Sequence, residues 1–333
     1  MHATVAQAEA PRGIGRQIEA VAVTGASGFV GRHLVERLLR EGVRVVAISR
    51  RPLQQPGVDT VASDYRDAAA LGRTFEGVNV VFHLAARAHQ ADASDASQQY
   101  RQANVEATEI VAQACVAAAV RRLVFVSSIG VHGNRTDGRP FTEAQAPVPV
   151  EAYAASKLEA EHVVQRLLGS GPTDYVVLRP PLVYGPGCPG NFGTLVELTA
   201  RAPIVPLGAI GAARTFIYVG NLVDALLIAA THPAASRRTF VAADGRDLSV
   251  GEVVRNLAAG LGRPARVVWN VPEALLALAA WLAGKGPAYA KLSAPLQVDA
   301  SAFREATGWQ PPFDPRQGLL ETAGQWTPAS RSV

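Results

Sequence analysis

Thr24-Gly-Ala-Ser-Gly-Phe-Val-Gly31 joins a short apolar strand at 20–24 to a helix predicted over 29–41. Three glycines lie three residues apart in it, at Gly25, Gly28 and Gly31. Glycine adopts positive φ and lets a ligand approach the backbone, and the helix N-terminus offers N–H groups and a partial positive charge to a pyrophosphate. A second strand at 43–48 completes a βαβ unit of the size that binds a dinucleotide. In that setting the glycines indicate a nucleotide site more than an ordinary tight turn.

Strand and helix patterns alternate over the rest of the first 180 residues. Further strands are predicted at 58–62, 78–83, 122–127 and 174–178, and further helices at 67–75, 97–119 and 153–168. Such alternation predicts an α/β fold, a Rossmann-type doubly wound parallel sheet with right-handed crossovers. Beyond Pro180 the chain becomes rich in proline and glycine, which predicts a smaller C-terminal substrate-binding lobe.

The expected domain organisation has three parts. Residues 1–18 contain no apolar run of signal-peptide length and are expected to form a flexible N-terminal extension. The nucleotide-binding domain is predicted over 19–180 plus about 216–244, and the substrate-binding lobe over about 181–215 plus 245–325. Two segments are expected to return to the main sheet, a helix starting near 221 and a strand at 239–242.

Tyr153 and Lys157 lie four residues apart in a predicted helix, so they share a face. An ammonium beside a phenol favours the phenolate, so we expect Lys157 to lower the Tyr153 pKa from about 10 and to make it a general acid or base. The pair alone would fit a solvated helix surface equally well. The predicted strand at 122–127 favours the catalytic reading. Ser127 and Ser128 stand at its carboxyl end, at the edge where open α/β sheets bind ligands.

On these motifs the chain, from about residue 19 to 325, resembles the extended short-chain dehydrogenase/reductase family of NAD-dependent epimerase/dehydratase type. His83-Leu-Ala-Ala86, Asn104 and Leu178–Pro186 add to the resemblance. It implies that Ser128, Tyr153 and Lys157 are catalytic. The implied cofactor-binding residues are Gly25, Ser27, Gly28, Phe29, Val30, Gly31, Arg50, Asp64, Leu84, Ala85, Ala86, Asn104, Ser127, Tyr153, Lys157 and Pro180.

The resemblance also implies a substrate side. Asn191, Phe192 and Arg214 match positions with which nucleotide-sugar enzymes hold the diphosphate and nucleoside, and the planar fork of an arginine suits a phosphate. Ser128 would orient the sugar oxygen, and Asp299 would contact the nucleotide ribose. Leu182 stands where many sugar epimerases have an asparagine, so the phosphate contacts are expected to differ in detail.

The end of the second strand bears on the choice of cofactor. The segment Ala47-Ile-Ser-Arg-Arg51 has no carboxylate, and the next one is Asp59. A carboxylate at this place accepts the ribose hydroxyls of NAD, whereas an arginine accommodates the 2′-phosphate of NADP. Arg50 therefore favours NADP(H) slightly. NAD(H), with Arg50 as a solvated surface charge, is the alternative.

The predicted function is an NAD(P)-dependent nucleotide-sugar oxidoreductase acting at C4 of a UDP-hexose or UDP-N-acetylhexosamine, a 4-keto reductase of surface-polysaccharide biosynthesis. A UDP-sugar 4-epimerase with tightly bound NAD uses the same residues and is almost equally favoured. The 4,6-dehydratases of the resembled family have a pair of acidic residues directly after the catalytic serine or threonine. Ile129 and Gly130 stand at these two positions here, which argues against a dehydratase. A reductase of a non-nucleotide carbonyl such as a steroid and a non-catalytic NADP-sensing protein are further alternatives. Arg214 disfavours the first, and the retained Tyr153 and Lys157 disfavour the second.

Composition limits the other classes. The chain has 333 residues, is 48% hydrophobic and carries a net charge of +4 with scattered arginines, which indicates a large core and no nucleic-acid surface. Two cysteines make no disulfide framework, which fits the cytoplasm, and the histidines show no metal-ligand spacing. The resemblance to the family also implies a homodimer.

The apolar stretch 272–283 is too short for a bilayer span of about 20 residues, so we expect no integral membrane span there. A packed helix of the small lobe is the favoured reading, and contact with a membrane or partner is the alternative.

Overall fold

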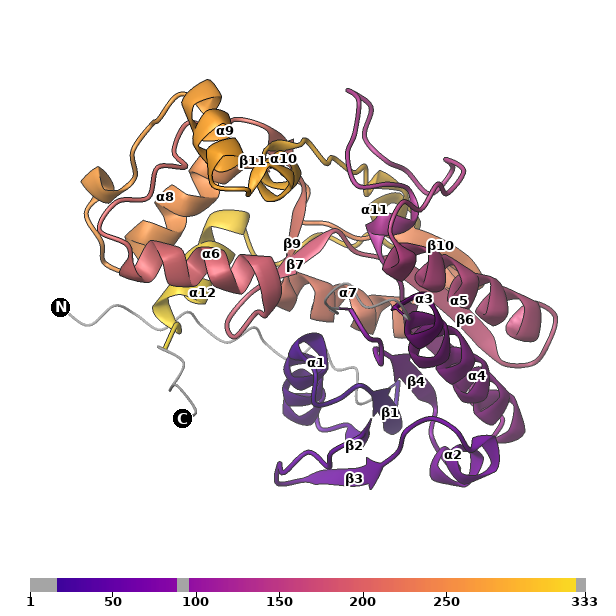
Figure 1. Cartoon of the computed structure of the whole chain (residues 1–333). Coiled ribbons are helices and arrows are strands. Elements are labelled where there is room, and N and C mark those ends of the chain that lie inside the picture. Colours follow the sequence, from indigo (N-terminus) through magenta and orange to yellow (C-terminus); the bar gives the residue numbers. More distant parts are fainter. Residues whose placement is uncertain (1–16, 89–95, 328–333) are drawn as a thin grey trace.

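The computed structural model describes residues 17–88 and 96–327. Its larger part is a seven-stranded, wholly parallel sheet in the order β10-β6-β5-β4-β1-β2-β3 (Figure 1). The strands are β1 (Ala20–Thr24), β2 (Arg44–Ser49), β3 (Val58–Ala62), β4 (Val80–His83), β5 (Arg122–Val126), β6 (Asp174–Arg179) and β10 (Arg238–Val241). The predicted doubly wound sheet is confirmed, including the returning strand β10.

Helices cover both faces of this sheet. They are α1 (Phe29–Arg40), α2 (Ala68–Thr74), α3 (Ala96–Tyr100), α4 (Ala107–Ala117), α5 (Ala152–Leu168) and α7 (Val219–Thr231). Side chains alternate along each strand, so Val21 and Val23 pack on the side of α1 and α7, whereas Ala22 packs on the side of α4 and α5. The near-continuous apolar strands follow from burial on both faces.

The helix predicted over 97–119 is not continuous. A π-helical segment, η2 (Arg101–Glu106), separates α3 from α4. A π-helical turn contains an extra residue, and such turns are frequent at functional sites. Asn104 lies in η2 with its side chain buried.

A smaller lobe lies beyond the carboxyl ends of the strands (Figure 1). Its helices are α6 (Gly190–Arg201), α8 (Val250–Gly260), α9 (Glu273–Leu282), α10 (Gly286–Ser293) and α12 (Pro315–Gly324). Two short ladders join it, β7 (Leu182–Tyr184) with β9 (Phe216–Tyr218) and β8 (Ala213–Arg214) with β11 (Leu248–Ser249). An aromatic core that includes Tyr184, Phe192 and Phe216 holds the lobe together.

Two segments lie elsewhere than the predicted domain boundaries place them. Ile18, assigned to the extension, is fully buried in the core of the main sheet, while residues 1–16 lie outside the described part. Helix α11 (Ser301–Thr307), assigned to the small lobe, packs against β10, and Phe303 contacts the rings of Phe240 and Trp309. The apolar side of α11 therefore completes the core of the larger domain.

Candidate active site

The turn between β1 and α1 is built so tightly that only glycine fits. Gly25 has φ +69°, and a Cβ on it would lie 2.7 Å from the backbone nitrogen of Ala85. A Cβ on Gly31 would lie 2.3 Å from the carbonyl oxygen of Gly25. Gly28 is the N-cap of α1 and is exposed, as is Ser27 beside it. The first turn of α1 therefore leaves backbone N–H groups free at the helix N-terminus, the arrangement that binds a pyrophosphate.

Tyr65 anchors this turn and was not identified from the sequence. Its hydroxyl accepts a hydrogen bond from the backbone N–H of Gly25 at 3.0 Å and donates one to the carbonyl of Ile48 at 2.9 Å. Burial raises the pKa of Tyr65 to about 12, so the phenol stays protonated and can do both. A tyrosine in a loop without periodic pattern carries no sequence signal for this role.

Other predicted cofactor residues follow the strands on either side of β1. Leu84 and Ala85 continue from β4, and their N–H groups donate to the carbonyl and hydroxyl oxygens of Thr24 at 3.2 Å and 3.3 Å. Arg50 is exposed just after β2, and Asp64 is exposed and paired with Arg66 at 3.3 Å. The strand order reverses between β1 and β4, the place where doubly wound sheets bind ligands.

The three predicted catalytic residues come from two neighbouring elements at this edge. Tyr153 lies in the first turn of α5, and Lys157 follows one turn later with its side chain buried. Ser128 caps the short 3-10 helix η3 (Ile129–Val131), and its Oγ accepts a hydrogen bond from Gly130 N at 3.1 Å. A Cβ on Gly130 would contact both Ser128 Oγ, at 3.4 Å, and the Cβ of Ala154, at 3.5 Å. A small residue at 130 thus lets η3 pack beside the start of α5.

The electrostatics of the pair differ from the sequence expectation. Burial, with a smaller contribution from the neighbouring phenol of Tyr100, raises the pKa of Tyr153 to about 12. Burial lowers the pKa of Lys157 to about 7, against a raising effect of Glu161. The ammonium of Lys157 lies over the ring of Phe125, 4.1 Å from its centroid. The expected lowering of the tyrosine pKa by lysine is therefore absent from this structure, because desolvation outweighs it.

A buried charged network lies beneath Lys157. Glu161, one turn after Lys157 on α5, accepts hydrogen bonds from Arg179 at 2.9 Å and 2.5 Å and one from the hydroxyl of Ser127. Arg179 Nη1 also lies 2.8 Å from His132 Nε2. Burial and the adjacent arginine lower the pKa of His132 to about 4, so the imidazole is neutral and accepts this bond. The network fixes Ser127, and with it the chain direction at Ser128.

Asn104 links the loop after β4 to the catalytic helix. Its Oδ1 accepts a hydrogen bond from the N–H of Arg87 at 2.8 Å, and its Nδ2 donates to Ser156 Oγ at 2.9 Å. Ser156 in turn donates to the carbonyl of Tyr153 at 2.7 Å. The π-helical segment thus holds the first turn of α5 in place. A direct contact of Asn104 with a cofactor stays a prediction.

The predicted substrate residues do not form one cluster. Arg214 is half-buried, and its Nη1 donates to the carbonyls of Lys291 and Ala294 at 2.9 Å and 2.6 Å. Asn191 is exposed in the first turn of α6, whereas Phe192 is buried among Tyr184 and Phe216. The side chain of Phe192 is therefore a packing residue of the lobe. Asp299 accepts from Ser301 N at 2.8 Å, and that hydrogen bond lowers its pKa.

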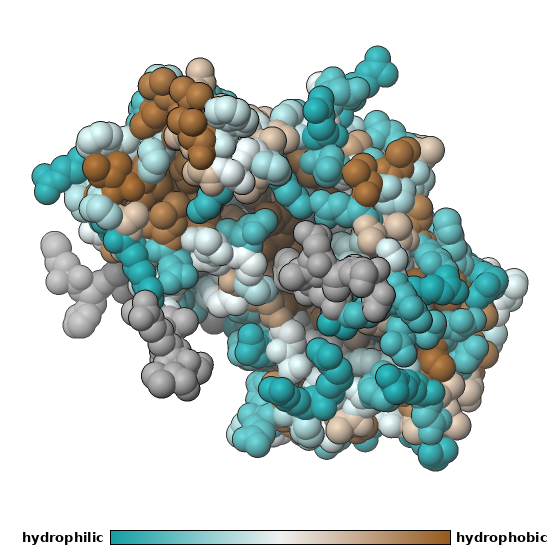
Figure 2. Space-filling model, in the orientation of Figure 1, coloured by the Kyte–Doolittle hydropathy of each residue, from teal (hydrophilic) through white to brown (hydrophobic). Residues whose placement is uncertain are grey.

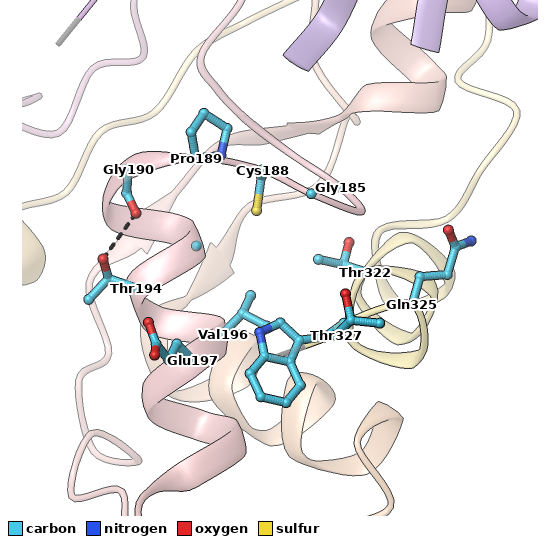
Figure 3. A pocket seen from close by; sticks show the side chains of 13 residues that line it. Gly185, Cys188, Pro189, Gly190, Thr194, Val196, Glu197, Thr322, Gln325 and Thr327 are labelled. Carbon is cyan, nitrogen blue, oxygen red and sulfur yellow. Dashed lines mark hydrogen bonds between the residues drawn. The ribbon is translucent and has the colours of Figure 1, made fainter. Parts of the chain in front are cut away.

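A separate hollow of about 370 Å³ lies in the lobe between α6 and α12 (Figure 3). Glycines and Cys188 line one side of it and Thr322, Gln325 and Thr327 the other, and Thr194 Oγ1 donates to the carbonyl of Gly190 at 3.2 Å. None of the catalytic residues lines it. Within the described ranges no three potential metal ligands come together.

The chain matches the model of the NAD dependent epimerase/dehydratase family over residues 21–243, a span that contains both the glycine-rich turn and the catalytic helix. It belongs to this family. The membership confirms the family and fold predicted from the sequence, and the chain is an NAD-dependent enzyme of this class. It gives no support to the slight preference for NADP(H) that was drawn from Arg50.

Relatives extend over most of the chain. A UDP-glucose 4-epimerase of Vibrio cholerae is 33% identical over 313 residues, covering 92% of this chain and 94% of that protein. The N-acetyl-alpha-D-glucosaminyl-diphospho-ditrans,octacis-undecaprenol 4-epimerase of Escherichia coli O157:H7 is 28% identical over 249 residues, covering 73% of this chain and 72% of that protein. The solved structure of MoeE5 in complex with UDP-glucuronic acid and NAD superposes with a TM-score of 0.74 at 29% identity, covering 92% and 98% of the two chains.

Proposed function

We propose that this protein is an NAD-dependent 4-epimerase of a hexose or N-acetylhexosamine that is linked through a diphosphate. The observation that supports the proposal is that Ser128, Tyr153 and Lys157 follow β5, which lies two strands from β1 and its glycine-rich turn in the sheet. The identity of 33% to the Vibrio cholerae UDP-glucose 4-epimerase, over nearly the whole of both chains, supports the same reaction.

The residues present fit a nicotinamide dinucleotide. The Gly25–Gly31 turn and the N-terminus of α1 would hold the pyrophosphate, and Lys157 would hold the ribose next to the nicotinamide. When bound, a nicotinamide supplies an acceptor that takes up a hydride and can return it. We favour NAD because the family is NAD dependent and because MoeE5 was solved with NAD.

The proton chemistry belongs to Tyr153 and Ser128. Tyr153 would exchange a proton with the sugar O4, while Ser128 Oγ hydrogen-bonds the same oxygen and orients it. With its pKa raised to about 12, the phenol is the protonated form that can donate to a 4-keto oxygen. Burial lowers the pKa of Lys157 to about 7, and its ammonium form would favour the phenolate of Tyr153 wherever the two groups come close.

A 4-keto reductase is the second candidate. Arg50 and Arg51 are exposed at the end of β2, and no carboxylate replaces them there. This is the arrangement that accommodates a 2′-phosphate, and reduced NADP is the usual donor for net reduction. The two reactions use the same acid and differ in whether the hydride returns to the sugar that released it.

The carrier of the diphosphate is a separate question. UDP is the carrier in the names of the Vibrio cholerae relative and of the MoeE5 complex, and an undecaprenyl group is the carrier in the name of the Escherichia coli relative. Arg214 is the candidate for the diphosphate, since burial lowers its pKa and an anion would compensate its charge. We place the enzyme in the cytoplasm as a homodimer, as the family resemblance implies.

The test is to denature the purified protein, identify the released nucleotide by mass, and then follow UDP-glucose, UDP-N-acetylglucosamine and undecaprenyl-diphospho-N-acetylglucosamine for conversion to their C4 epimers. Released NAD and interconversion of one of these pairs without net oxidation are expected. Consumption of added NADPH with a 4-keto sugar, and no interconversion, would instead identify the reductase.

A further inference from the structure

Helix α9 leaves its apolar side uncovered. None of its ten residues is buried. The exposed fractions are 57% for Leu275, 53% for Leu278, 71% for Trp281 and 71% for Leu282. These residues follow the spacing i, i+3, i+6 and i+7, so they share one broad face of the helix. In Figure 2 brown side chains gather over α9, at the upper left of the molecule.

The opposite side of α9 fixes this orientation. Leu276 packs with Val205, Val250 and Val254 in a core of the lobe, to which Tyr289 and Leu292 of α10 also belong. The hydroxyl of Tyr289 donates to the carbonyl of Glu273 at 3.1 Å. The helix therefore has its packing face satisfied, and the leucines and Trp281 point away from it. The sequence prediction of a packed helix is correct for one face only.

A second exposed tryptophan precedes α9 in the sequence. Trp269 is 52% exposed, and its indole nitrogen donates to the carbonyl of Arg266 at 3.0 Å. Its neighbour Val268 packs in the same core as Leu276. The α9 face is defined here as Leu275, Leu278, Trp281 and Leu282.

Exposed positive charges flank α9 in the sequence. Arg266 precedes Trp269 and Lys285 follows the end of α9, both exposed, whereas Lys291 on α10 is exposed but pairs with Glu151 at 2.7 Å. Between residues 255 and 291 the chain has five Lys or Arg and a single carboxylate, that of Glu273. Glu273 is turned to the body of the lobe, where its Oε1 accepts a hydrogen bond from Gly211 N at 3.0 Å. Leucines and tryptophans within a basic rim are typical of helices that lie in a membrane interface.

We propose that the α9 face docks the protein on the surface of an anionic phospholipid bilayer. No helix of the described residues is long and apolar enough to cross a membrane, so α9 would lie in the interface. A second copy of the chain fits less well, because a two-fold axis through the face would bring two sets of Arg266 and Lys285 together. An anionic surface complements both the apolar residues and their rim.

Docking would bear on the proposed diphosphate site through Arg214. Its guanidinium is held by the carbonyls of Lys291 and Ala294, at the end of the α9–α10 hairpin. The element that would touch the bilayer therefore also positions the side chain proposed for the diphosphate. The docking proposal does not depend on the sugar reaction, since it can be measured without turnover.

The test is co-flotation of the full chain with vesicles, comparing phosphatidylcholine alone with a mixture containing about one-third phosphatidylglycerol. The protein is expected to float with the anionic vesicles and much less with the neutral ones. The double variant Leu278→Ser, Trp281→Ser should lower the partition coefficient about tenfold or more, since two apolar side chains no longer enter the interface. The control is Val116→Ser, an exposed apolar residue on α4 of the main domain, which should float as the parent does.

The charged rim has its own variant. Arg266→Gln with Lys285→Gln should weaken flotation with anionic vesicles and reduce its salt dependence, whereas Arg66→Gln on the other domain should not. Circular dichroism and release of bound nucleotide check that each variant is folded. Three results would overturn the proposal: no flotation of the parent, flotation that the double variant retains, or a parent that forms oligomers which the double variant dissolves without any vesicle binding.

Discussion

Tyr153 is the residue on which the proposed chemistry depends, because no other described phenol stands one turn from a buried lysine on α5. Tyr153→Phe removes the hydroxyl group and its exchangeable proton but keeps the aromatic ring. The centroid of this ring lies 6.0 Å from that of Tyr100. We expect a folded protein that releases the same nucleotide on denaturation and turns over about 10² to 10⁴ times more slowly. The measurement is kcat at saturating sugar. Tyr100→Phe is the matched control and should stay within a few-fold of the parent; near-normal turnover by the Tyr153 variant would contradict the assignment.

At the same scale, the sequence located the reactive groups better than their surroundings. The three proposed catalytic residues could be predicted from residues close to them in the sequence. Tyr153 and Lys157 have helical spacing, and Ser128 directly follows a strand. The raised pKa of Tyr153 could not be predicted, since it arises from burial by segments far away in the chain. Tyr65 was missed for a related reason. Its two hydrogen bonds join residues 25 and 48, and no pattern near residue 65 encodes them.

At the scale of elements, α5 combines a catalytic face with a buried charge. Glu161 and Arg179 have side chains that are 1% and 6% exposed, and their closest atoms lie 2.5 Å apart. Glu161→Gln leaves Arg179 without its counter-charge, and we expect a loss of about 3–5 kcal/mol in the free energy of unfolding. Glu159→Gln, two residues earlier on α5, breaks an exposed pair with Arg101 and should cost no more than about 1 kcal/mol. Denaturant unfolding of both variants checks this, and equal losses would contradict the structural role of the buried pair.

Local sequence patterns predicted most element boundaries of the larger domain but not the features that depend on tertiary contacts. The seven strands of the main sheet and α1, α2 and α5 were predicted to within two residues, because strands buried on both faces and amphipathic helices have clear periods. The short strands of the lobe, β7, β8, β9 and β11, were not predicted. The π-helical segment η2 was predicted as ordinary helix. Its extra residue is stabilised by the contacts of Asn104 with Arg87 and Ser156, which are tertiary. Helix α9 was predicted from its apolar composition, which does not tell a buried face from an exposed one.

At the scale of the whole molecule, one buried carboxylate ties the sheet to the lobe. Asp244 follows β10 and accepts hydrogen bonds from Tyr218 N at 2.9 Å, from Asn221 Nδ2 at 2.7 Å and from the hydroxyl of Tyr184 at 3.1 Å. The same hydroxyl lies 3.1 Å from the carbonyl of Pro315 at the start of α12, so its one proton is shared between the two acceptors. Asp244 therefore helps to fix how the lobe sits on the larger domain, although no sequence motif identified this residue.

Asp244 gives the junction a pH dependence of unusual sign. Burial raises its pKa to about 6 in the folded chain, against about 3.9 when unfolded. The folded state therefore binds more protons between these values, so the contribution of Asp244 to stability is full below pH 4 and is lost as the pH rises through 6.

The Asp244→Asn side chain does not titrate. Its amide group also faces hydrogen-bond donors, which lowers the stability of the folded state by about 1–3 kcal/mol. The variant should therefore be less stable than the parent by a margin that is on the order of 2–3 kcal/mol larger at pH 4 than at pH 7.5. Urea unfolding of both proteins at the two pH values measures the margin. A margin that grows with pH would mean that the hydrogen bonds to the carboxylate outweigh its burial.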